Sequence, residues 1–314
     1  MTRVVLLAGG VGGAKMAEGF AALEDIDLTV IGNVADDDDF HGLWVSPDID
    51  TMLYTLSGRI NREQGWGVAD EGRRALDTLT ELGADTWMFL GDRDFGLHIY
   101  RSERLRRGDR PSDITADIAR RYGISTRIVL PTDDRVQTKV RTDKGWQSFQ
   151  EYFVRDRCAP EVLELRYDGL KDARLTPEAA SSIAEADLMV IAPSNPLVSI
   201  APILGIPGLR DAVHAAKAPV IGISPLIAGK VVKGPADRMM LSLGHRADVL
   251  GVAQIYQGLV SKLLIDTQDA GFAPDIEALG ITAHATDILM PDATQKARLA
   301  QEIITLAALS KEPA

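Results

Sequence analysis

Four glycines and the lysine that follows them are well suited to bind an anion. Gly9, Gly10, Gly12 and Gly13 come directly after the first apolar run of the chain, and Lys15 follows them. Glycine lets the backbone turn sharply and approach a ligand closely. If a helix begins here, its free N–H groups and dipole favour a phosphate, to which Lys15 would add a charge. The stretch predicts a phosphate site, although a turn that only packs a helix against a strand would also use glycine.

Neither of the two common glycine-rich nucleotide motifs fits this stretch. The dinucleotide pattern G-x-G-x-x-G matches Gly10 and Gly12 but finds Lys15 where its third glycine belongs. The Walker A pattern needs a glycine directly before its lysine, and Ala14 stands there. The stretch is therefore neither a dinucleotide-binding motif nor a Walker A motif.

Acidic residues follow the second apolar run, residues 28–33. Asp36 and Asp37 begin a series of four aspartates, whose mutual repulsion a divalent cation would relieve. Ligands of α/β sheets bind at the carboxyl ends of strands, so these acids should lie beside the glycines. Asp36 and Asp37 are candidate metal ligands, and a solvated acidic loop is the alternative.

A second pair of aspartates, Asp48 and Asp50, begins the predicted short helix around residues 52–57. Ser46 or Asp48 can cap this helix, and Pro47 suits its first turn. Capping accounts for one aspartate only. The other is available to hydrogen-bond a ligand or to bind a metal.

Two more predicted strand ends carry polar side chains. Arg93 and His98 follow the apolar residues 87–90. Arg93 could bind a phosphate, and His98 could line the same cleft. The alternative is a turn in which the aspartates on either side of Arg93 form ion pairs with it. Ser194 and Asn195 stand between two prolines. They predict a second phosphate or nucleotide contact, and a merely rigid connection is the alternative.

The elements that must position these residues form an α/β pattern. Strands are predicted at 4–8, 28–33, 87–90, 126–130, 187–192, 219–223, 249–253 and 263–266, a hairpin at 137–150, and a final amphipathic helix at 292–309. We predict a doubly wound, mostly parallel, Rossmann-like sheet built from residues 1–91 and 169–314. A smaller α+β subdomain is expected as an insertion at 92–168.

Composition narrows the functional classes. The 314 residues carry a formal net charge of −11, which argues against a broad nucleic-acid or anionic-membrane surface. Cys158 is the only cysteine, so an intramolecular disulfide and a cysteine zinc cluster are excluded. With no signal-peptide pattern and no apolar run of about 20 residues, we expect a cytoplasmic protein.

Six collinear motifs together resemble one known family. They are Gly9-Gly10-x-Gly12-Gly13-Ala14-Lys15, Asn33-x-x-Asp36-Asp37, Ser46-Pro47-Asp48-x-Asp50-Thr51, Leu90-Gly91-Asp92-Arg93-Asp94, Ala192-Pro193-Ser194-Asn195-Pro196 and Ser224-Pro225-Leu226-Ile227-Ala228-Gly229. The set is similar to the 2-phospho-L-lactate transferase family of deazaflavin coenzyme F420 biosynthesis, over nearly the whole chain.

The resemblance implies a magnesium-dependent transferase and suggests a homodimer. Such an enzyme joins the ribityl hydroxyl of the deazaflavin Fo to a phospho-acid carried on a guanosine diphosphate-linked donor, and it releases GMP. The acid is phospholactate, phosphoenolpyruvate or phosphoglycerate. Asp50 matches the family's Fo-contacting aspartate, and Phe89 stands where archaeal relatives have a lysine that contacts Fo. Phe89, Arg93 and His98 are therefore expected on the Fo side.

Two other functions compete with the transferase. A nucleotide-sugar-binding regulatory protein of the same fold would keep the glycines and the Ser194–Asn195 loop but would need neither a metal pair nor Asp50. An NAD-dependent dehydrogenase lacks support, because the third glycine and the single acid after the second strand are both missing. The motif that contains Asp50 favours the transferase.

Overall fold

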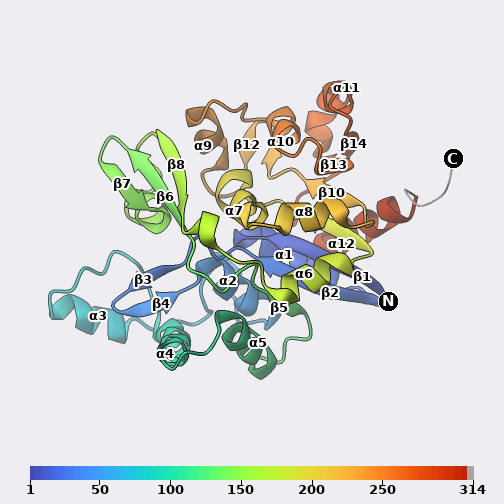
Figure 1. The fold of residues 1–314 in the computed structure, drawn as a ribbon. Helices are drawn as coiled ribbons and strands as arrows, with labels where there is room; N and C mark the ends of the chain where they lie inside the picture. The colour runs from blue at the N-terminus through green and yellow to red at the C-terminus, as the bar shows by residue number, and fades with distance from the viewer. Residues whose placement is uncertain (310–314) are drawn as a thin grey trace.

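The computed structural model describes residues 1–309 and is organised around a seven-stranded sheet (Figure 1). Its strands are β1 (Thr2–Ala8), β2 (Ile26–Gly32), β5 (Arg127–Val129), β9 (Leu188–Ile191), β10 (Val220–Ile223), β13 (Lys262–Ile265) and β14 (Thr282–Ala285). Every pairing in this sheet is parallel. The spatial order is β14-β13-β10-β9-β1-β2-β5, so the chain winds outward from β1 in one direction and then in the other. The predicted doubly wound parallel sheet is confirmed.

Helices cover both faces of the sheet because its central strands are apolar on both sides. In β1, Val4 and Leu6 contribute to one core, and Val5 and Leu7 contribute to the other. The first core includes α1 (Gly10–Ala21), α2 (Pro47–Leu56), α5 (Pro111–Arg121) and α12 (Ala293–Leu309). The second includes α6 (Pro177–Ala184), α7 (Ala201–Gly205), α8 (Leu209–Ala215), α10 (Val249–Ile255) and α11 (Ala273–Glu277).

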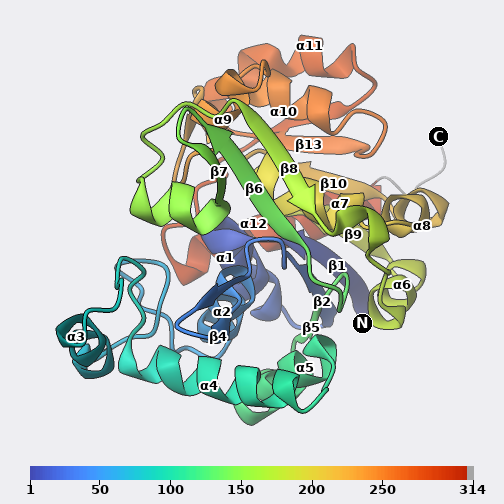
Figure 2. The same ribbon diagram turned by 60° about the vertical axis from the view of Figure 1, so that its left-hand side comes forward.

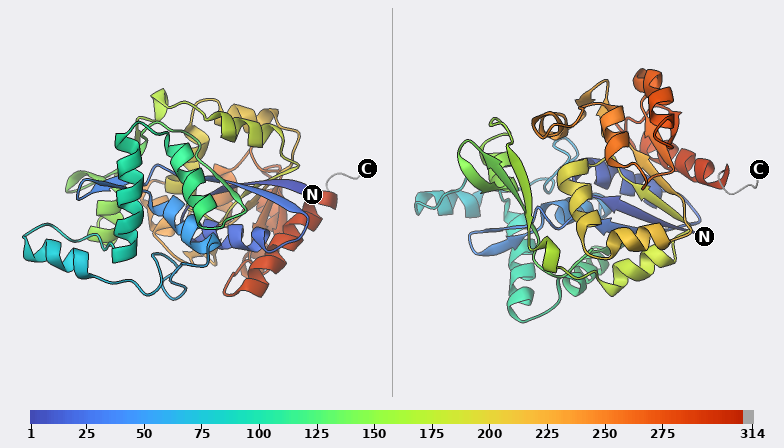
Figure 3. Two further views of the ribbon diagram at one scale, coloured as in Figure 1. Left: turned by 90° about the horizontal axis from the view of Figure 1, so that it is seen from below. Right: turned by 45° about the horizontal axis from the view of Figure 1, so that its top comes forward.

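Smaller elements gather beyond the carboxyl ends of the sheet strands, on the side away from the N-terminus (Figures 2 and 3). They include the hairpin β3 (Asp38–Phe40) with β4 (Leu43–Val45), the antiparallel sheet of β6 (Gln137–Thr142), β7 (Gly145–Ser148) and β8 (Glu164–Asp168), α3 (Arg74–Glu81) and α4 (Asp92–Arg106). The predicted hairpin at 137–150 is confirmed.

The remaining elements are short. They are the pair β11 (Leu226–Ile227) and β12 (Lys230–Val231), the helix α9 (Ala236–Ser242), the π-helices η1 (Glu151–Arg155) and η3 (Pro196–Ile200), and the 3₁₀ helices η2 (Leu170–Asp172) and η4 (Thr267–Phe272). Within residues 1–309, no single helix is long and apolar enough to cross a membrane. One bent pair, α8 with the segment 196–205, reaches the required length and apolar composition only when the two pieces are taken together.

Two strand predictions are wrong. The apolar run at 249–253 belongs to helix α10, which Asp248 caps by accepting a hydrogen bond from the Gly251 N–H at 2.9 Å. Residues 87–90 form no strand and instead pack in a third apolar cluster, where the Trp87 and Phe40 ring centroids lie 5.3 Å apart.

The stretch 92–168 contains one strand of the main sheet as well as the strands of a separate small sheet. Strand β5 lies within it and pairs with β2 in the main sheet, whereas β6, β7 and β8 form a sheet of their own. The short antiparallel sheet thus accounts for residues 137–168 only. The division of the chain into two domains stays a prediction.

Candidate functional site

A large cavity lies at the carboxyl ends of the strands, where the strand order reverses between β1 and β9. Open parallel sheets bind ligands at this switch point. The cavity measures about 550 Å³ and is lined by residues from the turns after β1, β2, β9 and β10. Loops that are distant in sequence therefore meet in one place.

Two hydrogen bonds join the glycine stretch to the Ser194 loop at this point. The Gly9 N–H donates to Ser194 Oγ at 3.1 Å, and Ser194 Oγ donates back to the Gly9 carbonyl at 2.7 Å. A methyl group on Gly12 would lie only 2.2 Å from the Pro193 carbonyl oxygen. Tight packing therefore accounts for part of the glycine pattern, while Gly9, Gly10 and Gly12 also line the cavity.

Lys15 lies in the second turn of α1 and also lines the cavity. Among the described residues, it makes no hydrogen bond and no ion pair. Burial lowers the pKa of its amine, and the positive charge of Lys296 lowers it further. The Glu18 charge opposes this shift without forming an ion pair with Lys15. A partly buried cation near a helix N-terminus is suited to hold an anion.

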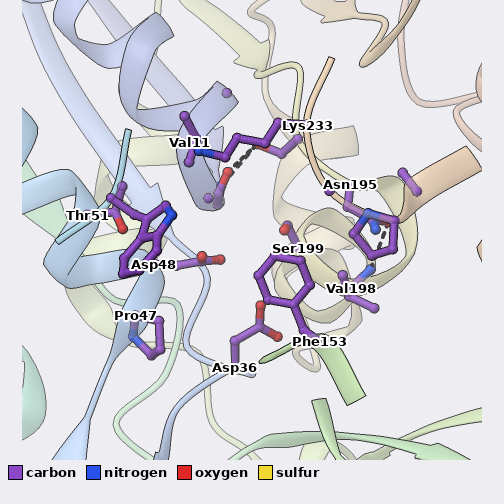
Figure 4. A pocket seen from close by; sticks show the side chains of 18 of the residues that line it. Val11, Asp36, Pro47, Asp48, Thr51, Phe153, Asn195, Val198, Ser199 and Lys233 are labelled. Atoms are coloured by element: carbon purple, nitrogen blue, oxygen red, sulfur yellow. Dashed lines mark hydrogen bonds between the residues drawn. The ribbon is translucent and has the colours of Figure 1, made fainter. Parts of the chain in front are cut away.

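Two carboxylates also face the cavity. Figure 4 shows Asp36 and Asp48 pointing into the same space. Asp48 accepts a hydrogen bond from Asn33 Nδ2 at 2.9 Å and another from the Gly10 backbone, and burial raises its pKa to about 6. Within residues 1–309, Asp36 Oδ1 has no hydrogen-bond partner. Burial, followed by the Asp48 charge, raises the Asp36 pKa well above its usual range.

Asp37 points elsewhere. Its Oδ2 accepts hydrogen bonds from Ser46 Oγ at 2.7 Å and Trp44 Nε1 at 3.1 Å, and it does not line the cavity. Burial raises the pKa of Asp37 as well. Across residues 1–309, no three His, Cys, Asp or Glu side chains are grouped as a ready metal site. The cavity therefore brings Asp36 together with Asp48, and the pairing of Asp36 with Asp37 on a metal stays a prediction.

Asp50 lies deeper, in a buried ion pair between α2 and α4. Arg101 Nη1 donates to Asp50 Oδ2 at 3.1 Å, and Nη2 donates to Oδ1. His98 Nδ1 lies 3.7 Å from the same carboxylate, and burial lowers its pKa to about 4. Both Asp50 and His98 line the cavity. The pairing fixes the Asp50 carboxylate in one orientation beside a neutral imidazole.

Phe89 and Arg93 differ in their position. Phe89 lines the cavity, where the Arg73 guanidinium lies 5.7 Å from the centre of its ring. Arg93 donates to the Ala69 carbonyl at 2.9 Å and is not among the lining residues. Asn195 lines the cavity, although its Oδ1 is used to cap the following turn by accepting from the Leu197 N–H at 2.9 Å.

Comparison with known proteins agrees with this arrangement. Residues 4–289 match the family model described as 2-phospho-L-lactate transferase CofD. A phosphoenolpyruvate transferase of Streptomyces griseus subsp. griseus is 40% identical, with 97% of this chain and 98% of that protein aligned. A 2-phospho-L-lactate transferase of Methanopyrus kandleri is 38% identical, with 97% of each chain aligned. The chain belongs to the 2-phospho-L-lactate transferase family.

As a member of this family, it is a CofD-type phosphoacid transferase of coenzyme F420 biosynthesis. The fold agrees as well: the crystal structure of protein BH3568 from Bacillus halodurans superposes with a TM-score of 0.63 at 16% identity, over 96% of this chain and 99% of that one. At that identity, the likeness concerns the fold alone.

Three aromatic rings that line the transferase cavity were not predicted as site residues. Trp66 comes from a turn between α2 and α3 and is 43% exposed. Phe149 and Phe153 stack with their ring centroids 5.6 Å apart and their planes within 4°. The Gly65-Trp66-Gly67 turn was a visible signal in the sequence, whereas nothing near Phe149 and Phe153 separates them from core aromatics.

Proposed function

We propose that this transferase moves a phospho-acid from a guanosine diphosphate-linked donor to the ribityl hydroxyl of Fo and releases GMP, with a divalent cation such as Mg²⁺. One observation carries the proposal. One cavity is lined by anion-binding groups, carboxylates and aromatic rings, which are the three kinds of group that a diphosphate, a hydroxyl nucleophile and a flat ring need.

The donor diphosphate is assigned to the α1 side of the cavity. The helix N-terminus, Lys15 and the loop of Ser194 and Asn195 are all here. Asp48 already accepts a hydrogen bond from the start of α1, so a phosphate would lie next to a carboxylate. Like charges at that distance repel unless a cation lies between them.

The carboxylates fit such a cation. Asp36 Oδ1 has no partner, Asp48 faces the same space, and hard carboxylate oxygens are the ligands that Mg²⁺ prefers. We assign Asp36 and Asp48 as ligands, with water and phosphate oxygens completing the shell. When bound, the cation would neutralise charge on the phosphates during transfer.

Fo is assigned to the aromatic residues of the cavity lining, Trp66, Phe89, Phe149 and Phe153, whose rings can stack on the deazaflavin. Asp50, held by Arg101, would accept a hydrogen bond from the ribityl hydroxyl and orient it. The hydroxyl oxygen forms a bond to the phosphorus that carries the acid, and the bond from that phosphorus to the bridging oxygen of GMP breaks. The hydroxyl proton is released, and the Asp50 carboxylate, which contacts the hydroxyl, is the group that takes it.

A reconstituted reaction tests the proposal. Purified protein is mixed with Fo, Mg²⁺ and, in turn, the lactyl, enolpyruvyl and glyceryl forms of the guanosine diphosphate-linked donor. We expect GMP and the Fo phosphodiester in equal amounts by mass spectrometry from at least one donor. Asp50→Asn should largely abolish turnover, whereas Asp113→Asn, an exposed control on α5, should leave it unchanged. Absence of GMP with every donor, together with tight binding of a nucleotide sugar, would favour the regulatory alternative.

A further inference from the structure

A second lysine extends over the cavity near the start of α1. Lys233 belongs to the loop between β12 and α9, and it lines the same cavity as Lys15. Figure 4 shows its side chain extending over the cavity toward Val11, in the first turn of α1. Two cations from distant parts of the chain therefore line one cavity, and Lys233 lies near the first turn of α1.

The charge of Lys233 has no acidic counterpart. Its Nζ donates to the backbone carbonyl of Gln64, and no carboxylate of residues 1–309 lies within ion-pairing distance of it. Partial burial lowers the pKa of Lys233, and the charge of Lys15 lowers it further. Elsewhere the molecule pairs its buried lysine: Lys296 Nζ contacts Glu18 at 2.6 Å. Lys15 and Lys233 have no such partner among residues 1–309, and an anion that contacts both amines would reduce their repulsion.

The backbone around Gln64 is shaped to admit this amine. Gly65 has a φ of +75°, and a methyl group added to it would lie 3.4 Å from Lys233 Nζ and 3.1 Å from a methyl group of Val11. The carbonyl that Lys233 contacts is neutral, so it compensates the ammonium only in part. The amine can exchange this carbonyl for an anion without breaking an ion pair.

We propose that Lys233 is a second cationic ligand of the donor diphosphate, and that it contacts the phosphate group that Lys15 leaves unneutralised. This inference rests on the proposed function for the identity of the anion. Lys233 is a binding residue in this assignment, and the contact with Gln64 is its position before the anion arrives.

Nucleotides with one and two phosphates separate this role from a structural one. Binding of GDP and of GMP is measured by calorimetry for the wild type, Lys233→Met and Lys233→Arg. Because one charge-assisted hydrogen bond is lost at a partly exposed site, Lys233→Met should weaken GDP binding about tenfold and GMP binding less than about threefold. Lys233→Arg keeps the charge and should stay within about threefold of the wild type for GDP.

Lys230→Met is the matched control, because Lys230 is an exposed lysine of β12, three residues before Lys233, that does not line the cavity. It should leave GDP binding unchanged. If Lys233→Met weakens the binding of GDP and GMP equally, or leaves the affinity for GDP unchanged, the assignment is overturned. The role of Lys233 would then be structural, through its hydrogen bond to the Gln64 carbonyl.

A wild-type protein that binds neither nucleotide would contradict the proposed donor instead, since that result does not depend on Lys233. Inorganic pyrophosphate is the probe in that case. Weaker pyrophosphate binding by Lys233→Met than by Lys230→Met would still support the two-lysine site, and equal binding would overturn it.

Discussion

Replacing Arg101 by methionine should strongly destabilise the fold, because it leaves a buried carboxylate without its partner. Arg101 and Asp50 are each only 4% exposed, and both Asp50 oxygens are used by the guanidinium. Without Arg101, the donors that remain close to Asp50 are the Ser46 N–H at 3.3 Å and His98. Breaking one side of a buried ion pair costs about 3–5 kcal/mol, a large part of the roughly 5–15 kcal/mol that holds a typical domain together.

Urea unfolding followed by tryptophan fluorescence and by circular dichroism measures this loss. Arg107→Met is the matched control, since Arg107 pairs with Glu103 one turn away and its side chain is 65% exposed. An exposed pair of this kind contributes about 0.5 kcal/mol or less. We expect the Arg101 variant to lose several times more stability than the control variant.

A double variant tests the cause. Arg101→Met combined with Asp50→Asn removes both charges, so it should be less destabilised than the sum of the two single variants. A loss below about 1 kcal/mol for Arg101→Met, or strict additivity in the double variant, would show that the buried charge is not what the pairing compensates.

Three further predictions address the pH dependence of stability, the packing around two glycines and the aromatic residues of the cavity. Burial raises the pKa of Asp94 to about 6, so between pH 4 and 6 the folded protein holds a proton that the unfolded chain releases, and this contribution to stability is lost as the pH rises. As the pH rises from 4 to 6.5, the free energy of unfolding of Asp94→Asn should therefore increase relative to that of the wild type by on the order of 1–3 kcal/mol in urea titrations. A difference between the two proteins that does not change with pH would refute the raised pKa of Asp94. Gly12→Ala should unfold at lower temperature because its methyl group meets a main-chain oxygen at 2.2 Å, whereas Gly96→Ala, with open space around it in α4, should gain about 0.5–1 kcal/mol. Trp66→Ala should weaken Fo binding about tenfold in fluorescence titrations, and Trp146→Ala, similarly exposed but outside the cavity, should not; equal effects would remove Trp66 from the Fo site.

The sheet and the place of the site were predictable because they depend on strong local patterns. Uncharged β-branched runs predict strands that are buried on both faces, and glycine after such a run predicts a tight turn into a helix. Parallel strands put all their carboxyl ends at one edge. The turns that carry Gly9, Asp36 and Ser194 could therefore be expected to meet before the strand order was known.

The directions of single side chains could not be predicted in the same way. Asp36 and Asp37 are neighbours, yet one faces the cavity and the other faces Ser46 and Trp44. The motif around Arg93 looked like a loop but begins helix α4, in which residues spaced three or four apart share a face. Asp94, His98 and Arg101 lie on the face toward Asp50, so Arg93 turns away.

Short apolar runs were the other source of error. The run at 249–253 has no periodicity that separates a strand from a helix, and only the Asp248 cap marks the helix start. Phe149 follows β7 directly and Phe153 belongs to η1, and only tertiary packing brings their rings to the cavity that α1 borders. No local signal in the chain contains that information.

Calorimetric titration of Fo into the purified protein, with GDP and Mg²⁺ present and then absent, tests most directly whether one cavity accepts both substrates. We expect micromolar binding of Fo to the GDP-bound protein, which corresponds to about −8 kcal/mol. Failure of Fo to bind in both conditions, or complete exclusion of Fo by GDP, would contradict the shared cavity.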